Sequence, residues 1–372
     1  MESTIAPPLA MLRESAGVVH DELLALLRDS VSARFSPDPE GSPERIAGYL
    51  EDGLSLLTSR GFRLDSEVGL SMESFEVCRR LADQDARFRF IYRLPSSVGW
   101  GAAIGAAIGR ALYGETHDGV RVVTATLNAF MTFLDGLLDE APDVFNPHRE
   151  SLLQLVRDTD LHNGTRNGSV PRDHPYNTMC FLIARLWIDH FNRLSPPSQP
   201  GGLRNEFLCA ALRSMAVEYS ACDSRFGGAP PSMDVLYGRT SWPLWTQALA
   251  VMCQHGRPAD VDLGAFRKLI FRIGEYAAYL DDVRDYITDC AAAQWNTVSL
   301  AYYSRYPFPI DGAGVTQRQL LANLADDAFA EAVIQTGSEL CDSIEECLVG
   351  LRGVDSDSLR PLLADLTYEY LC

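Results

Sequence analysis

The chain has 372 residues, of which 47% are hydrophobic and 22% charged, an ordinary globular composition in a chain long enough to bury a sizeable core. Its formal net charge of −18, without any basic block, argues against nucleic-acid binding, which needs clustered Lys or Arg against phosphates. A protein this acidic can hold an anionic substrate only through metal ions or a few well-placed arginines.

Breakers divide the chain into long segments with helical spacing of apolar residues, such as 23–31 and 183–191. No sustained period-2 alternation occurs, and no Asn-Gly hairpin separates two strand-like runs. We therefore predict an all-α fold. We expect one continuous domain, in which N-terminal helices over residues 1–95 pack on a single large helical bundle over residues 96–372.

The cellular setting follows from the cysteines and the apolar segments. Nine scattered cysteines, without a CxxC pair, argue against zinc ribbons and disulfide frameworks. Residues 1–13 lack the pattern of a signal peptide, and the most membrane-like stretch, 98–113, is too short to span a bilayer. We expect a cytoplasmic protein without a transmembrane segment. The stretch 98–113 carries Gly101, Gly105 and Gly109, which predicts a small-residue helix packed closely against a neighbour.

A first cluster of carboxylates closes an apolar helix predicted over residues 126–140. Asp135 and Asp139 are four residues apart, so they lie on one face, one turn above the other. No Lys or Arg between positions 121 and 149 can neutralise them.

A second cluster follows the apolar residues of 273–280 and is denser. At about 100° per residue, Asp281, Asp282, Asp285 and Asp289 fall within an arc of about 100° of one helix. Such repulsion between like charges costs stability unless a cation lies between them.

Oxygen ligands without His or Cys suit hard cations such as Mg2+, which binds through a few carboxylates together with substrate phosphates. We expect Asp135 and Asp139 to bind Mg2+ from one wall. Asp281, Asp285 and Asp289 would bind it from the other wall, so that the two clusters clamp one diphosphate. Two solvated acidic faces are the alternative. The His-Asp pairs at 20–21 and 117–118 lack the second histidine pair of an HD phosphohydrolase.

These motifs resemble those of the class I isoprenoid synthases, which include trans-prenyl diphosphate synthases and class I terpene synthases. Residues 134–140 (LDGLLDE) resemble the first Asp-rich motif, and residues 281–289 the second. The order of the motifs is most similar to the bacterial large terpene synthase family, in which Asn and a tyrosine pair follow, as Asn296, Tyr302 and Tyr303 do here. The first motif departs by lacking doubled leading aspartates, and the second by being all Asp.

The resemblance implies a helical bundle with a deep apolar central cavity, three Mg2+ ions and a prenyl diphosphate substrate. It implies that Arg239 and Thr240, between the two motifs, contact the diphosphate, and that Asn296 contributes to the site. It makes Asp135, Asp281 and Arg239 the catalytic residues. A homodimer is compatible with it.

The reaction is expected to be cyclisation or elimination from one C15–C20 substrate, which makes the enzyme a carbon–oxygen lyase. Elongating synthases need a Gly-Lys-Arg stretch for a second diphosphate, and this chain has a single lysine, Lys268. Aromatic faces can stabilise a carbocation, and Phe133, Trp242 and Tyr279 are the substrate-wall residues we predict. A prenyltransferase with another acceptor and an inactive helical interaction protein are the alternatives.

Overall fold

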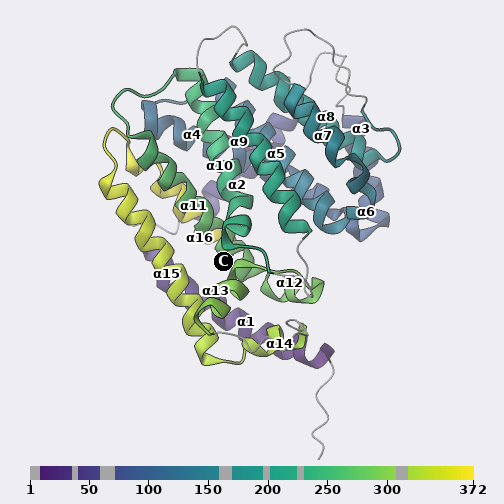
Figure 1. Cartoon of the computed structure of the whole chain (residues 1–372), viewed down its shortest axis with the longest axis vertical. Helices are drawn as coiled ribbons and strands as arrows, with labels where there is room; N and C mark the ends of the chain where they lie inside the picture. The colour runs from purple at the N-terminus through teal and green to yellow at the C-terminus, as the bar shows by residue number, and fades with distance from the viewer. Residues whose placement is uncertain are drawn as a thin grey trace, which may run out of the picture.

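The computed structural model describes residues 9–35, 41–58, 72–158, 170–195, 202–223, 230–306 and 317–372. Within these ranges the chain forms α-helices and short 3-10 helices and no β-strand, which confirms the predicted all-α fold (Figure 1). The α-helices are α1 (Leu9–Val31), α2 (Ser42–Thr58), α3 (Met72–Gln84), α4 (Leu94–Tyr113), α5 (Asp118–Glu140), α6 (Pro142–Phe145), α7 (Arg149–Arg157), α8 (Pro175–Leu194), α9 (Leu203–Cys222), α10 (Met233–His255), α11 (Leu263–Arg284), α12 (Tyr286–Ala292), α13 (Thr297–Arg305), α14 (Gln317–Asn323), α15 (Asp327–Gly350) and α16 (Arg360–Leu371). The 3-10 helices are η1 (Ser32–Arg34), η3 (Ala86–Arg93), η4 (Asn146–His148) and η6 (Ser356–Ser358).

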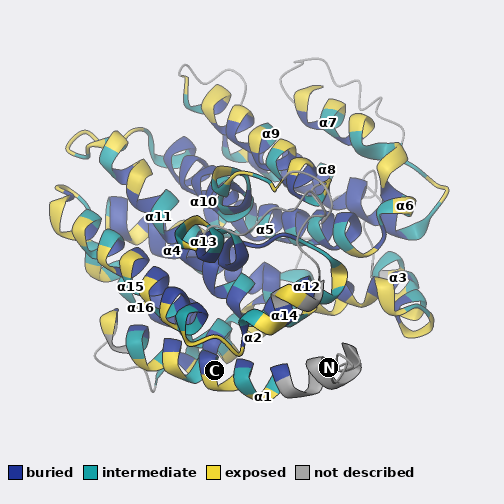
Figure 2. Ribbon diagram, turned by 60° about the horizontal axis from the view of Figure 1, so that its bottom comes forward, coloured by how far each residue is buried: buried dark blue, intermediate teal, exposed yellow. Residues whose placement is uncertain are grey.

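The bundle is built around α4, α5, α10 and α11. Helix α5 packs against α4, α8 and α10, and α10 packs in turn against α9 and α11. Helices α1 and α16 and the long α15 lie outside α11, and α2 lies against α4. Helices α4, α5 and α10 are mostly buried and α11 is buried over half of its residues, whereas α15 and the described side chains of α1 expose one side (Figure 2). Helix α10 therefore lies between the two helices that carry the carboxylate clusters.

Helix α5 illustrates how apolar the centre is. Among the described residues it is the one helix long and apolar enough to cross a membrane, and 72% of that apolar window is buried inside the structure. Its aromatic residues pack into the core between α5 and α8. There Phe130 stacks on Trp187 of α8, with ring centroids 5.7 Å apart. All nine cysteines of the chain are free.

Helix α4 packs closely against α5 through small residues, as the sequence predicts. A Cβ at Gly101 would lie 2.5 Å from the carbonyl oxygen of Thr124 and 2.8 Å from the Cα of Ala125. A Cβ at Gly105 would overlap the Thr124 hydroxyl oxygen. The two backbones are thus as near as glycine allows, and this closeness fixes the position of α5.

We predict that Gly101→Ala destabilises the fold by about 2 kcal/mol, because backbone atoms must move apart to admit the methyl group. Gly17→Ala, in the interior of α1 with nothing within 4 Å of the point where an added Cβ would lie, is the matched control. It should raise stability by about 0.5–1 kcal/mol, because alanine has the higher helix propensity. Urea denaturation of both variants measures the difference; equal stability of the two would contradict the close α4–α5 contact.

Candidate functional site

The centre of the site is Arg239, in the second turn of α10. Its Nε donates to Oε1 of Glu218 on α9 at 2.9 Å, and its Nη2 donates to Oδ2 of Asp139 on α5 at 3.0 Å. Nη2 also donates to Oδ1 of Asp135. One guanidinium thus joins three carboxylates from two helices, and the predicted pair Asp135 and Asp139 is brought together around it.

The position of this first cluster in its helix explains why it needs a cation. Asp135 and Asp139 lie in the last two turns of α5, which has no basic residue in its last turn. The C-terminal end of a helix carries partial negative charge, so carboxylates there are disfavoured without a countercharge. Burial alone would lower the pKa of Arg239, but Glu218, Asp139 and Asp135 outweigh it and hold that pKa well above its usual range. The guanidinium therefore stays charged.

Glu218 is the acid of this group that water does not reach, because its side chain is only 3% exposed. Burial raises the pKa of Glu218 well above its usual value, and the nearby Arg239 opposes that rise. One turn later on α9, the Cys222 thiol donates to Oδ1 of Asp139 at 3.1 Å. Burial raises the pKa of this thiol, so it remains a protonated donor.

The second cluster lies where α11 ends. The sequence predicts one continuous helix through residue 289, whereas α11 ends at Arg284 and α12 begins at Tyr286, with Asp285 at the joint. The Asp285 amide still donates to the Asp281 carbonyl at 2.9 Å, so the helical spacing of the two acids is kept. Beside the joint, Nε2 of His20 on α1 donates to the carbonyl of Val283 at 2.6 Å.

Arg284 has the same function at α11 that Arg239 has at α5. Its Nη2 donates to Oδ1 of Asp281 at 2.5 Å and its Nε donates to Oδ1 of Asp285 at 3.1 Å. The guanidinium carbon also lies 4.8 Å from the ring centroid of Tyr370 on α16. The sequence contains Arg284 inside the second motif, but its pairing with two of the predicted ligands appears only in the structure.

The other two acids of the second cluster hold the start of α13. Oδ2 of Asp282 accepts the backbone N–H of Thr297 at 2.6 Å, and Oδ2 of Asp289 accepts from Nδ2 of Asn296 at 3.1 Å. Asn296 in turn caps α13 by accepting the Ser299 amide at 2.9 Å. The structure thus places the predicted Asn296 beside the predicted Asp289.

The two clusters share one electrostatic environment. Burial raises the pKa of Asp281 to about 7, Arg284 lowers it, and the charges of Asp285, Asp282 and Asp135 raise it further. Burial likewise raises the pKa of Asp282 to about 6, against the opposing effects of the bond from Thr297 and of Arg239. The Asp281 side chain is itself 45% exposed, at the edge of this cluster.

Among the described residues, no three His, Cys, Asp or Glu side chains converge closely enough to hold a metal ion by themselves. The carboxylates come in pairs, Asp135 with Asp139 and Asp281 with Asp285, and each pair binds an arginine. Mg2+ usually binds one or two carboxylates together with phosphates and water. Each pair of aspartates offers only oxygen ligands at the C-terminal end of a helix and already binds a cationic side chain. Such a pair fits Mg2+.

Two predicted wall residues lie away from the carboxylates. Phe133 packs against Phe90 and Tyr176, with ring centroids 5.2 and 5.6 Å apart, and the Tyr279 hydroxyl donates to the Val333 carbonyl of α15 at 2.9 Å. Each aromatic residue precedes an aspartate by two positions. That spacing turns it about 160° from the acid on the helix, and both side chains are fully buried in the core.

Trp242 lies in a different contact, between two arginines. The guanidinium carbons of Arg213 and Arg267 lie 5.6 and 5.1 Å from its ring centroid, and Phe271 meets it edge to face at 5.1 Å. The half-buried Thr240 follows Arg239 directly on α10. Of the predicted substrate contacts outside the acids, Arg239, Thr240 and Asn296 are the ones near the carboxylates.

Sequence reasoning missed Glu218 and Cys222. Neither belongs to an Asp-rich motif, and they lie four residues apart near the end of α9. A lone acid inside an otherwise apolar helical stretch is the signal that could have identified Glu218, because a buried carboxylate requires a partner.

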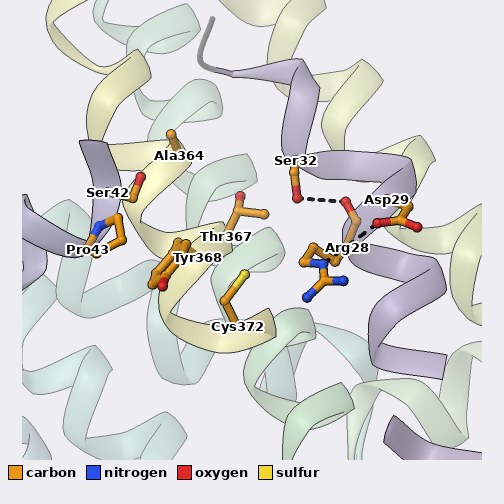
Figure 3. Close-up of a pocket in the computed structure, with 9 residues that line it drawn as sticks. All are labelled: Arg28, Asp29, Ser32, Ser42, Pro43, Ala364, Thr367, Tyr368 and Cys372. Atoms are coloured by element: carbon orange, nitrogen blue, oxygen red, sulfur yellow. Dashed lines mark hydrogen bonds and ion pairs between the residues drawn. The ribbon is translucent and has the colours of Figure 1, made fainter. Parts of the chain in front are cut away.

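A separate pocket of about 350 Å³ opens between α1, α2 and α16, and Figure 3 shows its lining. It contains none of the residues of the carboxylate site. Its lining residues are Arg28, Asp29, Ser32, Ser42, Pro43, Ala364, Thr367, Tyr368 and Cys372. The deep apolar cavity beside the aspartates stays a prediction.

No protein-family model matches the chain, and no curated protein matches it. Among solved structures, it is similar to a geranylgeranyl pyrophosphate synthetase from the archaeon Geoglobus acetivorans, at 13% identity and a TM-score of 0.46 over 87% of this chain and 98% of that one. It is also similar to the T. brucei farnesyl diphosphate synthase complexed with bisphosphonate BPH-722, at 13% identity and a TM-score of 0.39 over 90% and 100% of the two chains. Both are synthases of prenyl diphosphates, the group that the motifs resemble.

We predict that metal-free protein is more stable near pH 5 than near pH 8. The pKa of Asp281 is about 7 when folded and 3.8 ordinarily, so between about pH 4 and pH 7 the folded state holds a proton that the unfolded state has lost. Stability therefore falls as the pH rises through that window. In Asp281→Asn, the fall in melting temperature between pH 5 and pH 8 should be smaller than in the wild type. Asp143→Asn, which changes a side chain that is 69% exposed, is the control, and its fall in melting temperature should equal that of the wild type. Identical pH profiles of wild type and Asp281→Asn would contradict the assignment.

We predict that Arg239→Met lowers the free energy of unfolding by roughly 3 kcal/mol, because it leaves the buried Glu218 carboxylate without a countercharge. Adding Glu218→Gln should recover more than half of the loss, because a neutral amide is less costly to bury. Arg87→Met, which breaks an exposed pair with Asp85, should cost less than about 1 kcal/mol. Urea denaturation compares them; a double variant no more stable than Arg239→Met would show that the charge of Glu218 is not the cause.

Proposed function

We propose that the chain is a class I terpene synthase that ionises a linear prenyl diphosphate of C15 to C20 and then cyclises the carbocation or eliminates a proton from it. One observation carries the proposal: two pairs of aspartates end α5 and α11, on either side of the helix that presents Arg239. In a chain of net charge −18, this is an arrangement suited to an anion that arrives together with metal ions.

The proposed roles follow from the contacts. Asp135 and Asp139 on one wall, and Asp281 and Asp285 on the other, would hold Mg2+, with Asp289 as a further ligand. Mg2+, three ions by the resemblance, would neutralise the charge that develops on the leaving diphosphate.

In the structure, Arg239 binds the first pair. Its planar fork matches phosphate oxygens, so it can exchange a carboxylate for a diphosphate while Glu218 keeps its Nε. Thr240, beside it, is proposed to contact the same group. The free cysteines suit a reducing cytoplasm, where we place the enzyme.

A transferase reaction is the second candidate. A prenyltransferase that joins the prenyl group to another acceptor would use the same aspartates and the same arginine. The single lysine and the lack of a Gly-Lys-Arg stretch favour the one-substrate reaction over elongation with a second diphosphate.

We predict that the protein releases inorganic diphosphate from geranyl, farnesyl or geranylgeranyl diphosphate in the presence of Mg2+, and that excess EDTA abolishes the release. Asp135→Ala and Asp139→Ala should each lower turnover roughly 100-fold or more, because each removes a charge that stabilises the transition state. Gas chromatography–mass spectrometry of the extract distinguishes a cyclised or eliminated product from a prenylated acceptor.

Asp143→Ala, four residues beyond Asp139 at a side chain of α6 that is 69% exposed, is the matched control and should keep wild-type turnover. Circular dichroism should show unchanged helicity in all three variants. Full turnover in EDTA, or no diphosphate release from any of the three substrates, would rule out the proposal.

A further inference from the structure

Helix α5 presents one polar stripe to water. Between residues 123 and 138 every side chain is buried except Asn128, Thr132 and Asp135, and Asp139 continues the series. These residues are spaced by four, three and four positions, so they form one face of the helix. Because α5 is enclosed by α4, α8 and α10, water reaches it along this face, which is the face that carries the proposed metal ligands.

A second polar contact between α5 and α10 lies on this face. Nε2 of Gln247 donates to Oδ1 of Asn128 at 3.4 Å, as Arg239 donates to Asp135 further along. Asn128 precedes Asp135 by seven residues and Gln247 follows Arg239 by eight, so the helices run antiparallel here. At 1.5 Å per residue, the amide contact lies about 10–12 Å from the arginine, two turns deeper in the bundle.

The amide contact leaves oxygen atoms short of donors. Gln247 is fully buried, and its Oε1 has no hydrogen-bond partner. Nδ2 of Asn128 donates to the Ser97 carbonyl at 2.8 Å and to the Ser97 hydroxyl at 3.1 Å, which fixes Oδ1 toward Gln247. That Oδ1 receives one long bond. If the Gln247 amide were turned over, its Oε1 would face Oδ1 of Asn128. Both atoms are acceptors, so this orientation would not give Oε1 a hydrogen bond either.

The polar contacts around Asn128 include more groups than are needed to join α4 to α5. The bonds from Asn128 to Ser97, and from the Ser97 hydroxyl to Thr132 at 2.7 Å, already join α4 to α5. Gln247 adds a buried carbonyl that destabilises the fold if nothing donates to it. Buried groups of this kind are commonly satisfied by an ordered water.

We propose that Gln247 and Asn128 hold a water molecule that captures the carbocation, so that the product is a terpene alcohol. This inference rests on the proposed function and names its product class. The water donates one O–H to Oε1 of Gln247 and the other to Oδ1 of Asn128, which leaves a lone pair free.

The capture step balances without a redox partner. A bond forms between the water oxygen and the cationic carbon, and the resulting oxonium loses one proton. That proton passes to solvent along the half-buried face at Thr132, and the oxygen remains in the product as a hydroxyl.

The first test follows the oxygen. Wild-type enzyme with Mg2+ and farnesyl diphosphate in H2 18O should yield an alcohol that carries 18O. In Gln247→Met the ratio of alcohol to hydrocarbon should fall about tenfold or more, because the variant loses the acceptor that orients the water. Diphosphate release should stay within about twofold, because ionisation takes place two turns away.

Two further variants separate this role from a structural one. In Gln247→Glu, burial favours a protonated acid, which can donate to Asn128 and still accept from the water, so the alcohol should return. Thr126→Val removes a hydroxyl of α5 that bonds its own helix at the Val122 carbonyl, and the product ratio should not change. A ratio that falls equally in Thr126→Val, or fails to return in Gln247→Glu, overturns the proposal.

A second test does not depend on turnover. A crystal structure of the metal-free wild type should show a water within about 3 Å of both Oε1 of Gln247 and Oδ1 of Asn128. No water there, with Oε1 bound to a protein donor, overturns the water site whatever the activity. Normal diphosphate release with an unlabelled hydrocarbon as the product overturns water capture and leaves the proposed function intact. Absent diphosphate release rules out the proposed function itself, and the crystal structure then decides the water site.

Discussion

The rest of the site depends on one interaction, the guanidinium of Arg239 among three carboxylates. Asp135 and Asp139 end α5, where the helix dipole already disfavours negative charge, and Glu218 brings a third carboxylate that water does not reach. The guanidinium offsets the repulsion among these carboxylates where α5, α9 and α10 meet. The close packing of α4 on α5 through glycines then fixes how deep the α5 stripe lies.

The same charge arrangement recurs on α11, where Arg284 holds Asp281 and Asp285. In both places a helix ends in acids and an arginine compensates them, so the metal-free fold is stable while the acids stay close together. In the proposed function, a cation would arrive with an anionic ligand, and each arginine would leave its carboxylates for the anion. This property, rather than an already formed metal cage, is what the proposed function depends on.

Helix α5 combines two environments along its length. One face packs aromatic residues such as Phe130 and Phe133 into the core, and the other carries Asn128, Thr132 and the two aspartates. In the proposed function, the charged end would bind the diphosphate, and the amides deeper in the bundle would contact a neutral polar group. The chemistry of a bound substrate would therefore change from one end of this face to the other, over about two turns of helix.

The sequence determined the features that depend on local periodicity. Apolar spacing gave the helices, and the four-residue spacing of Asp135 with Asp139 and of Asp281 with Asp285 put each pair on one face, because the period of the helix is fixed. The tertiary structure alone decided which residues from distant segments meet those faces. Glu218 and Gln247 are isolated polar residues with no local pattern, and burial becomes visible only when α9 and α10 pack beside α5. The two-residue spacing of Phe133 from Asp135, and of Tyr279 from Asp281, also turns each aromatic residue away from its acid. Only the tertiary structure decided which core residues those aromatic side chains contact.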